Sequence, residues 1–178
     1  MTEYFPLYVI AQIFGAGAMA SLFFLYQQSS RKRLLAGKLS ADICWVVHYF
    51  LMGGYGGMIT NGVAIFRELT FMHRDKYKFL KTVATPIVFI AINFSLGLLT
   101  FSSPINILPI VTSAFVTTSL WLREPKFTKL VSIPVSVSFF IYDLVIGSWI
   151  GMINESIAIC SIIISFVKER KKTSNESK

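Results

Sequence analysis

The sequence predicts an all-α integral membrane protein with seven transmembrane helices. Three observations lead to this fold class. Hydrophobic residues make up 54% of the 178 residues and charged residues only 15%, whereas soluble domains carry about 25% charge. The apolar residues form uninterrupted stretches that are long enough to cross a bilayer. All 17 Lys and Arg residues lie between or after these stretches, as expected for the polar connections of a membrane protein.

The N-terminal half is expected to hold three membrane helices. The first covers residues 4–26, which would extend about 34 Å as a helix. The apolar stretch 39–66 is longer than one span needs, and it carries a cluster of glycines between residues 53 and 57. These glycines predict a hairpin of two short helices, over residues 39–53 and 54–70. One long tilted helix is the alternative.

The C-terminal half is expected to hold four more helices. Residues 82–101 form one, and the Ser102–Pro104 turn separates it from the next over residues 105–122. The apolar stretch 130–167 is too long for a single span, so it predicts two helices, over residues 130–147 and 148–167. Residues 168–178 are polar and basic and are expected to form a disordered cytoplasmic tail.

The distribution of positive charge favours the hairpin. With a hairpin over residues 39–66, all 17 Lys and Arg residues lie on one side of the membrane, and the other side keeps only Glu3. A single helix there would place the basic runs at 31–38 and 67–81 on opposite sides. The positive-inside rule therefore predicts an outside N-terminus and a cytoplasmic C-terminus. A cleaved signal peptide is rejected because its first residues would need positive charge.

A shift of 94 residues lays residues 39–66 on residues 133–160. The glycine pair Gly53 and Gly57 then meets Gly147 and Gly151. We therefore divide the chain into a first three-helix repeat with its loop (1–81), a linker helix (82–101) and a second three-helix repeat (102–167). Parallel repeats of this kind occur in transporters, where the substrate site lies near the middle of the membrane between the repeats.

Several short stretches resemble one family in their order and spacing. They are His48–Gly53, Arg67 at the end of the third helix, Ile107–Ile110, and the run from Ile146 to Glu155. These stretches resemble the YgjV-type bacterial inner membrane proteins, which are grouped with the PQ-loop and SWEET superfamily. The resemblance covers residues 11–170, and it implies a multi-pass protein of the bacterial cytoplasmic (inner) membrane with a SWEET-like 3+1+3 helix arrangement. It implies no particular activity.

The chain also departs from that family pattern at three places. The PQ dipeptide of the wider superfamily is absent, and Gln27–Gln28 stands near its expected position. Ala64 replaces an Asn that the pattern has one turn before Arg67, and Tyr142–Asp143 replaces a His-Asn pair.

Ionisable and polar residues inside the apolar stretches are the candidate site residues, because such groups are costly in a membrane. The 94-residue shift pairs His48 with Tyr142 and Tyr49 with Asp143. We expect these four side chains to converge from the second and sixth helices and to form one side of a solute pocket. His48 and Asp143 would pair or exchange a proton there. The alternative is that they only hold the helices together.

Four further residues complete the candidate set. Trp45 lies one turn before His48 and is a candidate to stack on a bound ring. Asn61, Asn154 and Glu155 are expected to form the next layer. Asp42 is interpreted as a charge near a helix N-terminus, and Arg67 as a residue that sets topology. Trp121 and Trp149 are expected at the membrane interfaces.

Other classes of function find little support in the sequence. The basic residues do not line one face, which argues against a nucleic-acid partner. His48 and His73 are the only histidines, so no three-histidine metal site can form, and no cofactor motif occurs. Apart from Ser40, which lies two turns from His48, the serines are expected to lack a nearby histidine base, which argues against an enzyme.

A small-solute transporter in a lipid bilayer is therefore the favoured hypothesis. The rival is a non-transporting accessory protein that docks a larger membrane partner. Asn93 and Ser95 would face either the pocket or another copy in a homo-oligomer.

Overall fold

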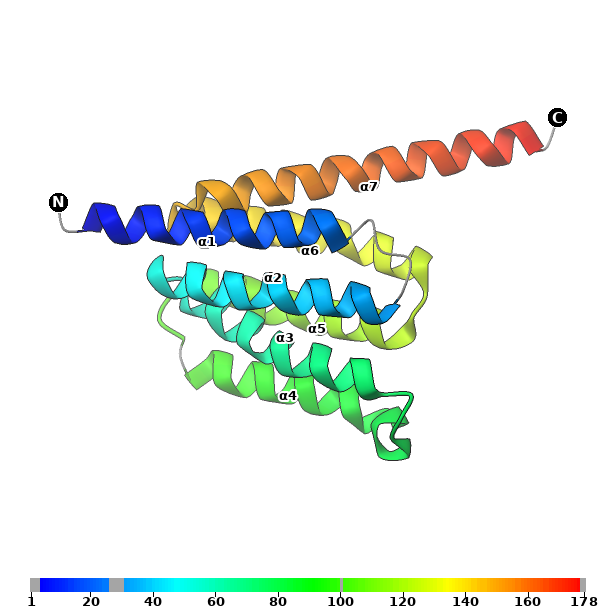
Figure 1. Cartoon of the computed structure of the whole chain (residues 1–178), viewed down its shortest axis with the longest axis horizontal. Coiled ribbons are helices and arrows are strands. Elements are labelled where there is room, and N and C mark those ends of the chain that lie inside the picture. The colour runs from blue at the N-terminus through cyan, green and yellow to red at the C-terminus, as the bar shows by residue number, and fades with distance from the viewer. Residues whose placement is uncertain (1–3, 26–30, 100, 177–178) are drawn as a thin grey trace.

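The computed structural model describes residues 4–25, 31–99 and 101–176. Within these ranges the chain forms seven α-helices, two short 3₁₀ helices and no strand (Figure 1). The α-helices are α1 (Tyr4–Leu25), α2 (Arg31–Leu51), α3 (Tyr55–His73), α4 (Ala84–Leu99), α5 (Ile107–Leu122), α6 (Pro125–Ile146) and α7 (Trp149–Glu176). The 3₁₀ helices η1 (Lys78–Lys81) and η2 (Pro104–Asn106) precede α4 and α5. The prediction of an all-helical chain with seven helices is confirmed.

The helix boundaries differ from the expected ones by five residues or more in three places. The hairpin is present, because α2 ends at Leu51 and α3 begins at Tyr55. However, α2 begins at Arg31 instead of residue 39, and α6 begins at Pro125 instead of residue 130. The tail expected to be disordered after residue 167 continues α7 as far as Glu176. Lys, Arg and Glu are good helix formers, so these polar segments extend helices whose apolar parts are shorter.

By length and hydropathy, the segment Pro104–Leu122 is apolar enough over 19 residues to cross a membrane. Shorter apolar segments lie in four other helices, at Pro6–Ser21, Ala84–Leu99, Leu130–Ile146 and Trp149–Ile164. Large apolar side chains are exposed on the outer surface of the bundle, among them Phe66 at 65% and Leu99 at 82%. Such a surface fits a lipid environment better than water.

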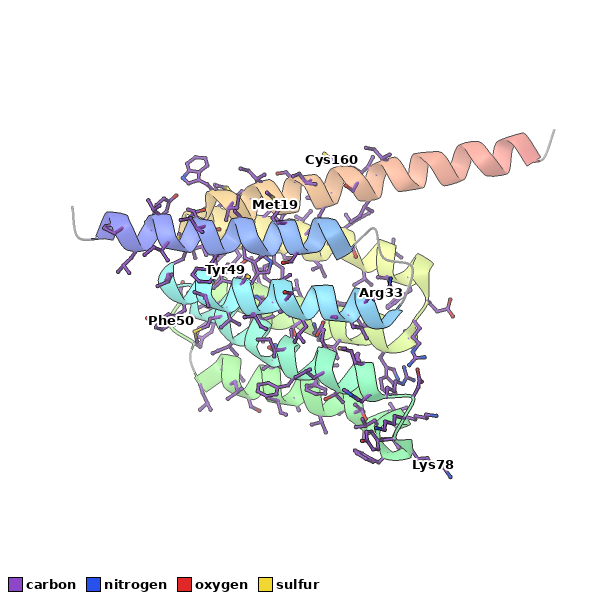
Figure 2. The ribbon with its side chains drawn as sticks, in the orientation of Figure 1. Met19, Arg33, Tyr49, Phe50, Lys78 and Cys160 are labelled. Atoms are coloured by element: carbon purple, nitrogen blue, oxygen red, sulfur yellow. The ribbon has the colours of Figure 1, made fainter. Side chains whose placement is uncertain are left out.

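The bundle has two ends, which we name by their connections (Figure 1). The turn end holds the start of α1, the α2–α3 turn (residues 52–54) and the α6–α7 turn (residues 147–148). The basic end holds the α3–α4 connection (residues 74–83), the α5–α6 connection (residues 123–124) and the far part of α7. In Figure 2, Tyr49 and Phe50 lie toward the turn end, whereas Arg33 and Lys78 lie at the basic end. α7 runs on past the basic end of the other helices (Figure 1).

Six of the helices follow one another as packed neighbours around the bundle. α1 packs on α2, α2 on α3, α3 on α5, α5 on α6, α6 on α7, and α7 returns to α1. α4 stands outside this series and packs on α3 and α5. The helix order therefore gives each of the segments α1–α3 and α5–α7 the same set of internal contacts.

The two turns at the turn end have the same backbone geometry at positions 94 residues apart. Gly53 and Gly147 both adopt the left-handed conformation, with φ of 70° and 74°, which favours glycine after a helix C-terminus. The next residue in each turn donates its N–H to the helix, Gly54 to the Tyr49 carbonyl and Ser148 to the Asp143 carbonyl, both at 2.8 Å. The glycine spacing in the sequence thus marks two equivalent helix ends.

Two further glycines allow close packing just after these turns. A Cβ on Gly57 would lie 2.9 Å from the Tyr49 ring, and a Cβ on Gly151 would collide with the Asp143 carboxyl group and the Ser148 hydroxyl. Nothing lies within 4 Å of a Cβ on Gly62. The Gly57 and Gly151 positions therefore have no room for a side chain, whereas Gly62 does.

We expect Gly151→Ala to lower the free energy of unfolding by about 1–3 kcal/mol through overpacking. The matched control, Gly62→Ala, should be neutral or slightly stabilising because alanine favours a helix and meets open space. Thermal melting of the purified variants in detergent measures both effects. Equal melting temperatures for the two variants would contradict the close packing at Gly151.

The basic end is fastened by contacts between the end of α3 and the end of α5. Arg74 lies 3.4 Å from the centre of the Trp121 ring and donates to the Trp121 carbonyl at 2.8 Å. Arg123 donates to Asp75 at 3.0 Å, and this hydrogen bond lowers the pKa of Asp75 below its ordinary value. Trp121 is 9% exposed and therefore packs inside the bundle, so it does not face lipid as an anchoring tryptophan of the interface would. Trp149 is 67% exposed.

Candidate functional site

The four residues paired by the 94-residue shift meet at the turn end of the bundle. The Tyr49 hydroxyl of α2 donates to Asp143 Oδ1 of α6 at 3.0 Å. The Tyr142 hydroxyl accepts the N–H of Gly57 from α3 at 3.0 Å. His48, Tyr49, Tyr142 and Asp143 are all buried, with exposed fractions of 3% or less. The structure thus brings the predicted group together at one contact between α2 and α6.

His48 is linked to this group through a residue that the sequence interpretation missed. His48 Nδ1 lies 2.7 Å from the Ala11 carbonyl, which only accepts. Nδ1 therefore carries the proton, and in the neutral ring Nε2 accepts from the Ser148 hydroxyl at 2.8 Å. Ser148 Oγ and the Asp143 carboxyl group both adjoin Gly151. Ser148 consequently stands between His48 and Asp143, which were expected to pair directly.

The role of Ser148 has a sequence signal of its own. It immediately precedes Trp149, the first residue of α7, and its hydroxyl accepts the N–H of Gly151 at 3.1 Å. This is the pattern of a serine at a helix N-terminus. The Ser148–His48 contact corrects the expectation that no serine other than Ser40 lies near a histidine. Because Ser148 is fully buried and already caps α7, we interpret this contact as part of the polar group that also holds His48, Tyr49, Tyr142 and Asp143.

Aromatic rings surround the polar group. Trp45 stacks on Tyr49 with ring centroids 5.5 Å apart, and Tyr49 meets Tyr142 edge to face at 5.7 Å. Trp45 also meets the His48 ring at 5.2 Å. Trp45 is 7% exposed, so the face predicted to stack on a bound ring is covered by Tyr49 in this conformation.

Asn61, Asn154 and Glu155 were expected to form the next layer. The Asn61 side chain donates to the Gly57 carbonyl of its own helix at 2.8 Å. Asn154 donates to Glu155 Oε1 at 3.0 Å, and both residues are half-buried on α7. Asn61 is thus engaged within α3, whereas Asn154 and Glu155 contact each other on α7.

Comparison with known proteins identifies the family. The model of the Imp-YgjV family, described as a bacterial inner membrane protein, matches residues 9–173. The chain belongs to this family. Neither a curated protein nor a solved structure matches it. The predicted resemblance and the inner-membrane location are therefore confirmed for this Imp-YgjV protein.

Helix geometry places the first polar group near one end of the bundle. At a rise of 1.5 Å per residue, Tyr49 lies about 3 Å from the end of α2, and Asp143 lies about 5 Å from the end of α6. The hydrocarbon core of a bilayer is about 30 Å thick. The group was expected near mid-membrane, and in this conformation it lies at the turn end instead.

A second polar group lies deeper and was not predicted as a site. Lys38 Nζ lies 3.1 Å from Asp42 and 3.3 Å from Glu68, and Arg67 Nη2 lies 3.1 Å from Glu68. Arg67 Nη1 also donates to Thr117 of α5 at 2.9 Å. We name the residues Lys38, Asp42, Arg67 and Glu68 the ionic cluster. By the same rise, Asp42 lies about 14 Å from the turn end and Arg67 about 18 Å.

The ionic cluster changes the interpretation of two residues. Arg67 was interpreted as a topology residue at the end of the third helix, yet α3 continues to His73 and Arg67 is 2% exposed. Asp42 was interpreted as a helix-terminal charge, yet it lies well inside α2 and is 3% exposed. Lys38 and Asp42 are separated by one helical turn, and this spacing is a sequence signal for the pair.

A shallow cavity also opens at the turn end, outside both polar groups. It has a volume of about 270 Å³ and is lined by Leu7 and Tyr8 of α1, Leu51 of α2, and Met52 of the α2–α3 turn. None of the predicted site residues lines it. Gln12, one turn deeper on α1, donates to the Met52 sulfur and accepts the N–H of Ile150. Gln12 thus ties α1 to the α2–α3 turn and to α7.

Proposed function

We propose that this Imp-YgjV protein carries a small polar solute across the bacterial inner membrane, as a uniporter or with proton coupling. The single observation that carries the proposal is the Tyr49–Asp143 hydrogen bond. The two residues come from opposite halves of the chain at equivalent positions, and both are buried in a protein that otherwise exposes apolar side chains. Ionisable residues within membrane helices are rare and are candidates for a functional site by default.

We also propose a 3+1+3 architecture, with α4 as the linker between two parallel three-helix repeats. The cyclic order of the six packed helices supports it, because the contact of α3 with α5 has its counterpart in the contact of α7 with α1. The equal turn geometry at Gly53 and Gly147 supports it further. The basic end would face the cytoplasm and the N-terminus the outside, by the positive-inside rule.

The rival proposal is an accessory protein whose small residues dock a partner. The expected docking pairs are Gly53 with Gly57 and Gly147 with Gly151. Gly57 and Gly151 face inward against Tyr49 and Asp143, whereas nothing lies within 4 Å of a Cβ on Gly53 or Gly147. The inward packing of one glycine in each pair favours the transporter, because that glycine is not available to another protein. A catalytic role is not proposed.

The first experiment identifies a solute. Purified protein is melted in detergent in the presence of individual sugars, vitamins and nucleosides. A ligand that binds only the folded state at 100 times its Kd adds about 2.7 kcal/mol to the free energy of unfolding and raises the melting temperature. Any compound that does so is then tested for uptake into proteoliposomes, with and without an imposed pH gradient.

We expect Asp143→Asn to abolish uptake or its pH dependence, because the variant keeps the shape of the side chain and loses its ionisable proton. The matched control is Asp75→Asn at the basic end, whose carboxyl group lies on the surface and should not affect uptake. Unchanged uptake and unchanged pH dependence in Asp143→Asn would remove the Tyr49–Asp143 group from the pathway.

A further inference from the structure

Unpartnered polar atoms in the buried part of the bundle gather on α3. Among the described residues, five buried side-chain oxygen or nitrogen atoms have no hydrogen-bond partner. Three of these atoms belong to α3, and they are Thr60 Oγ1, Arg67 Nε and Glu68 Oε2. A fourth is Asp143 Oδ2, in the polar group at the turn end. A buried polar atom without a partner costs free energy, so such atoms call for an explanation.

Thr60 is the clearest case, because other threonines of the bundle behave differently. Thr70, Thr112, Thr117 and Thr118 each donate to the carbonyl of the residue four positions earlier, at 2.7–2.8 Å. Thr60 is 5% exposed and makes no such bond. Its hydroxyl therefore remains free to bind a group that the protein does not supply.

Arg67 and Glu68 together leave one donor and one acceptor unused. Glu68 Oε1 takes hydrogen bonds from both Arg67 Nη2 and Lys38 Nζ, while Glu68 Oε2 takes none. Arg67 uses both of its terminal nitrogens, while Nε stays free. A group that both accepts and donates would satisfy the two free atoms, and a hydroxyl does so.

The charge of the ionic cluster indicates which class of ligand fits. Lys38 and Arg67 carry two positive charges, and Asp42 and Glu68 carry two negative charges, so the cluster is neutral when all four are ionised. An additional charged group would leave an uncompensated charge at membrane depth, which is costly. The cluster therefore suits an uncharged ligand.

The free atoms follow one line along α3. Gly57, Thr60, Ala64 and Arg67 succeed one another at spacings of three and four residues, which places them on one face of the helix. Gly57 packs against the Tyr49 and Tyr142 rings. This face therefore begins at the polar group of His48, Tyr49, Tyr142 and Asp143, which we name the turn-end group, and it ends at the ionic cluster. Thr60 lies between the two.

We propose that Arg67 and Glu68 form a second binding site, for the hydroxyl group of an uncharged polar solute, which Thr60 connects to the turn-end group. This inference rests on the proposed transport function. Hydroxyl groups come from two sources, a polyol solute or water, and the experiment separates them.

The test measures the volume change of proteoliposomes by stopped-flow light scattering. Vesicles are first shrunk with an impermeant solute, which reports water permeability, and then with glycerol or erythritol, whose entry causes re-swelling. We expect wild-type vesicles to re-swell in the polyols faster than protein-free vesicles. Arg67→Lys keeps the charge but removes Nε and one of the two terminal nitrogens. Loss of the Nε hydrogen bond to the solute should by itself slow the protein-dependent re-swelling by about tenfold, the effect of one charge-assisted hydrogen bond.

Two further variants separate an effect on solute binding from an effect on folding. Thr60→Val removes only an unpartnered hydroxyl, so its melting temperature should not fall, whereas polyol entry should. Arg74→Lys, at the basic end, is the matched control for Arg67→Lys and should keep wild-type polyol entry.

Each remaining outcome overturns the second site. Wild-type vesicles that re-swell no faster than protein-free vesicles exclude polyol binding. Loss of water permeability alone in Arg67→Lys assigns the free atoms to water. Wild-type polyol entry in both Arg67→Lys and Thr60→Val, combined with its loss in Asp143→Asn, shows that the second site is wrong while the proposed transport function stands.

Discussion

Replacing Glu68 by alanine is expected to lower the free energy of unfolding by about 3–5 kcal/mol. Glu68 is fully buried and neutralises Arg67 and Lys38, which it contacts at 3.1 and 3.3 Å. Without Glu68 the ionic cluster keeps two cations and one anion in a medium that solvates charge poorly. Thermal or denaturant unfolding of the purified variant in detergent measures the loss. Asp75→Ala removes an exposed partner of Arg123 and should cost less than about 1 kcal/mol.

A second variant separates stability from function at the same place. Replacing all four residues of the ionic cluster by apolar residues of similar size removes the charges together. Buried ion pairs replaced in this way often leave stability unchanged or increase it. We therefore expect a folded protein that no longer carries solute. A Glu68→Ala variant as stable as wild type would show that the ionic cluster is not buried as described.

Replacing Tyr142 by alanine is expected to lower the free energy of unfolding by a similar amount, about 3–5 kcal/mol. Tyr142 is fully buried and packs against Tyr49 and Phe139, with ring centroids 5.7 and 6.4 Å away. Tyr142→Phe keeps the ring and loses the hydroxyl that accepts the Gly57 N–H, so it should cost about 1–3 kcal/mol. Melting temperatures of the two variants give the comparison.

Tyr55→Ala is the matched control for Tyr142→Ala. Tyr55 begins α3 at the turn end and is 45% exposed, so its removal should change the melting temperature little. If Tyr142→Ala and Tyr55→Ala behaved alike, the centre of the turn end would be loosely packed, contrary to the contacts described.

The sequence predicts the helices well and their ends less well. The hairpin between Leu51 and Tyr55 follows from glycine spacing and from the one-sided placement of positive charge, two signals that act independently. The starts of α2 and α6 and the end of α7 do not follow from hydropathy, because polar helix formers such as Lys and Arg continue a helix beyond its apolar part.

The part of the candidate site that lies in the repeated segments was predictable from the sequence. The 94-residue shift places Tyr49 opposite Asp143, and the two residues form a hydrogen bond. Ser148 was missed because the shift pairs it with Gly54, which has no side chain to compare. The ionic cluster was missed because Arg67 was interpreted through topology and Asp42 as a charge near a helix N-terminus. Lys38 lies in the part of α2 that was expected to be a loop. Neither the repeat nor the charge pattern shows how the side chains pack. This packing decides how deeply each polar side chain is buried and which residue it contacts.

The central claim is that a polar solute passes along the inward face of α3, and the accessibility of Thr60 tests it most directly. The two natural cysteines, Cys44 and Cys160, are replaced by alanine, and Thr60→Cys is introduced as the only thiol. A membrane-impermeant thiol reagent is applied to vesicles of each orientation. Phe66→Cys, at a position 65% exposed on the outer surface of α3, is the lipid-facing control and should not react. We predict that Cys at position 60 reacts from both sides and is protected by the transported solute. A thiol there that reacts from neither side would contradict the account.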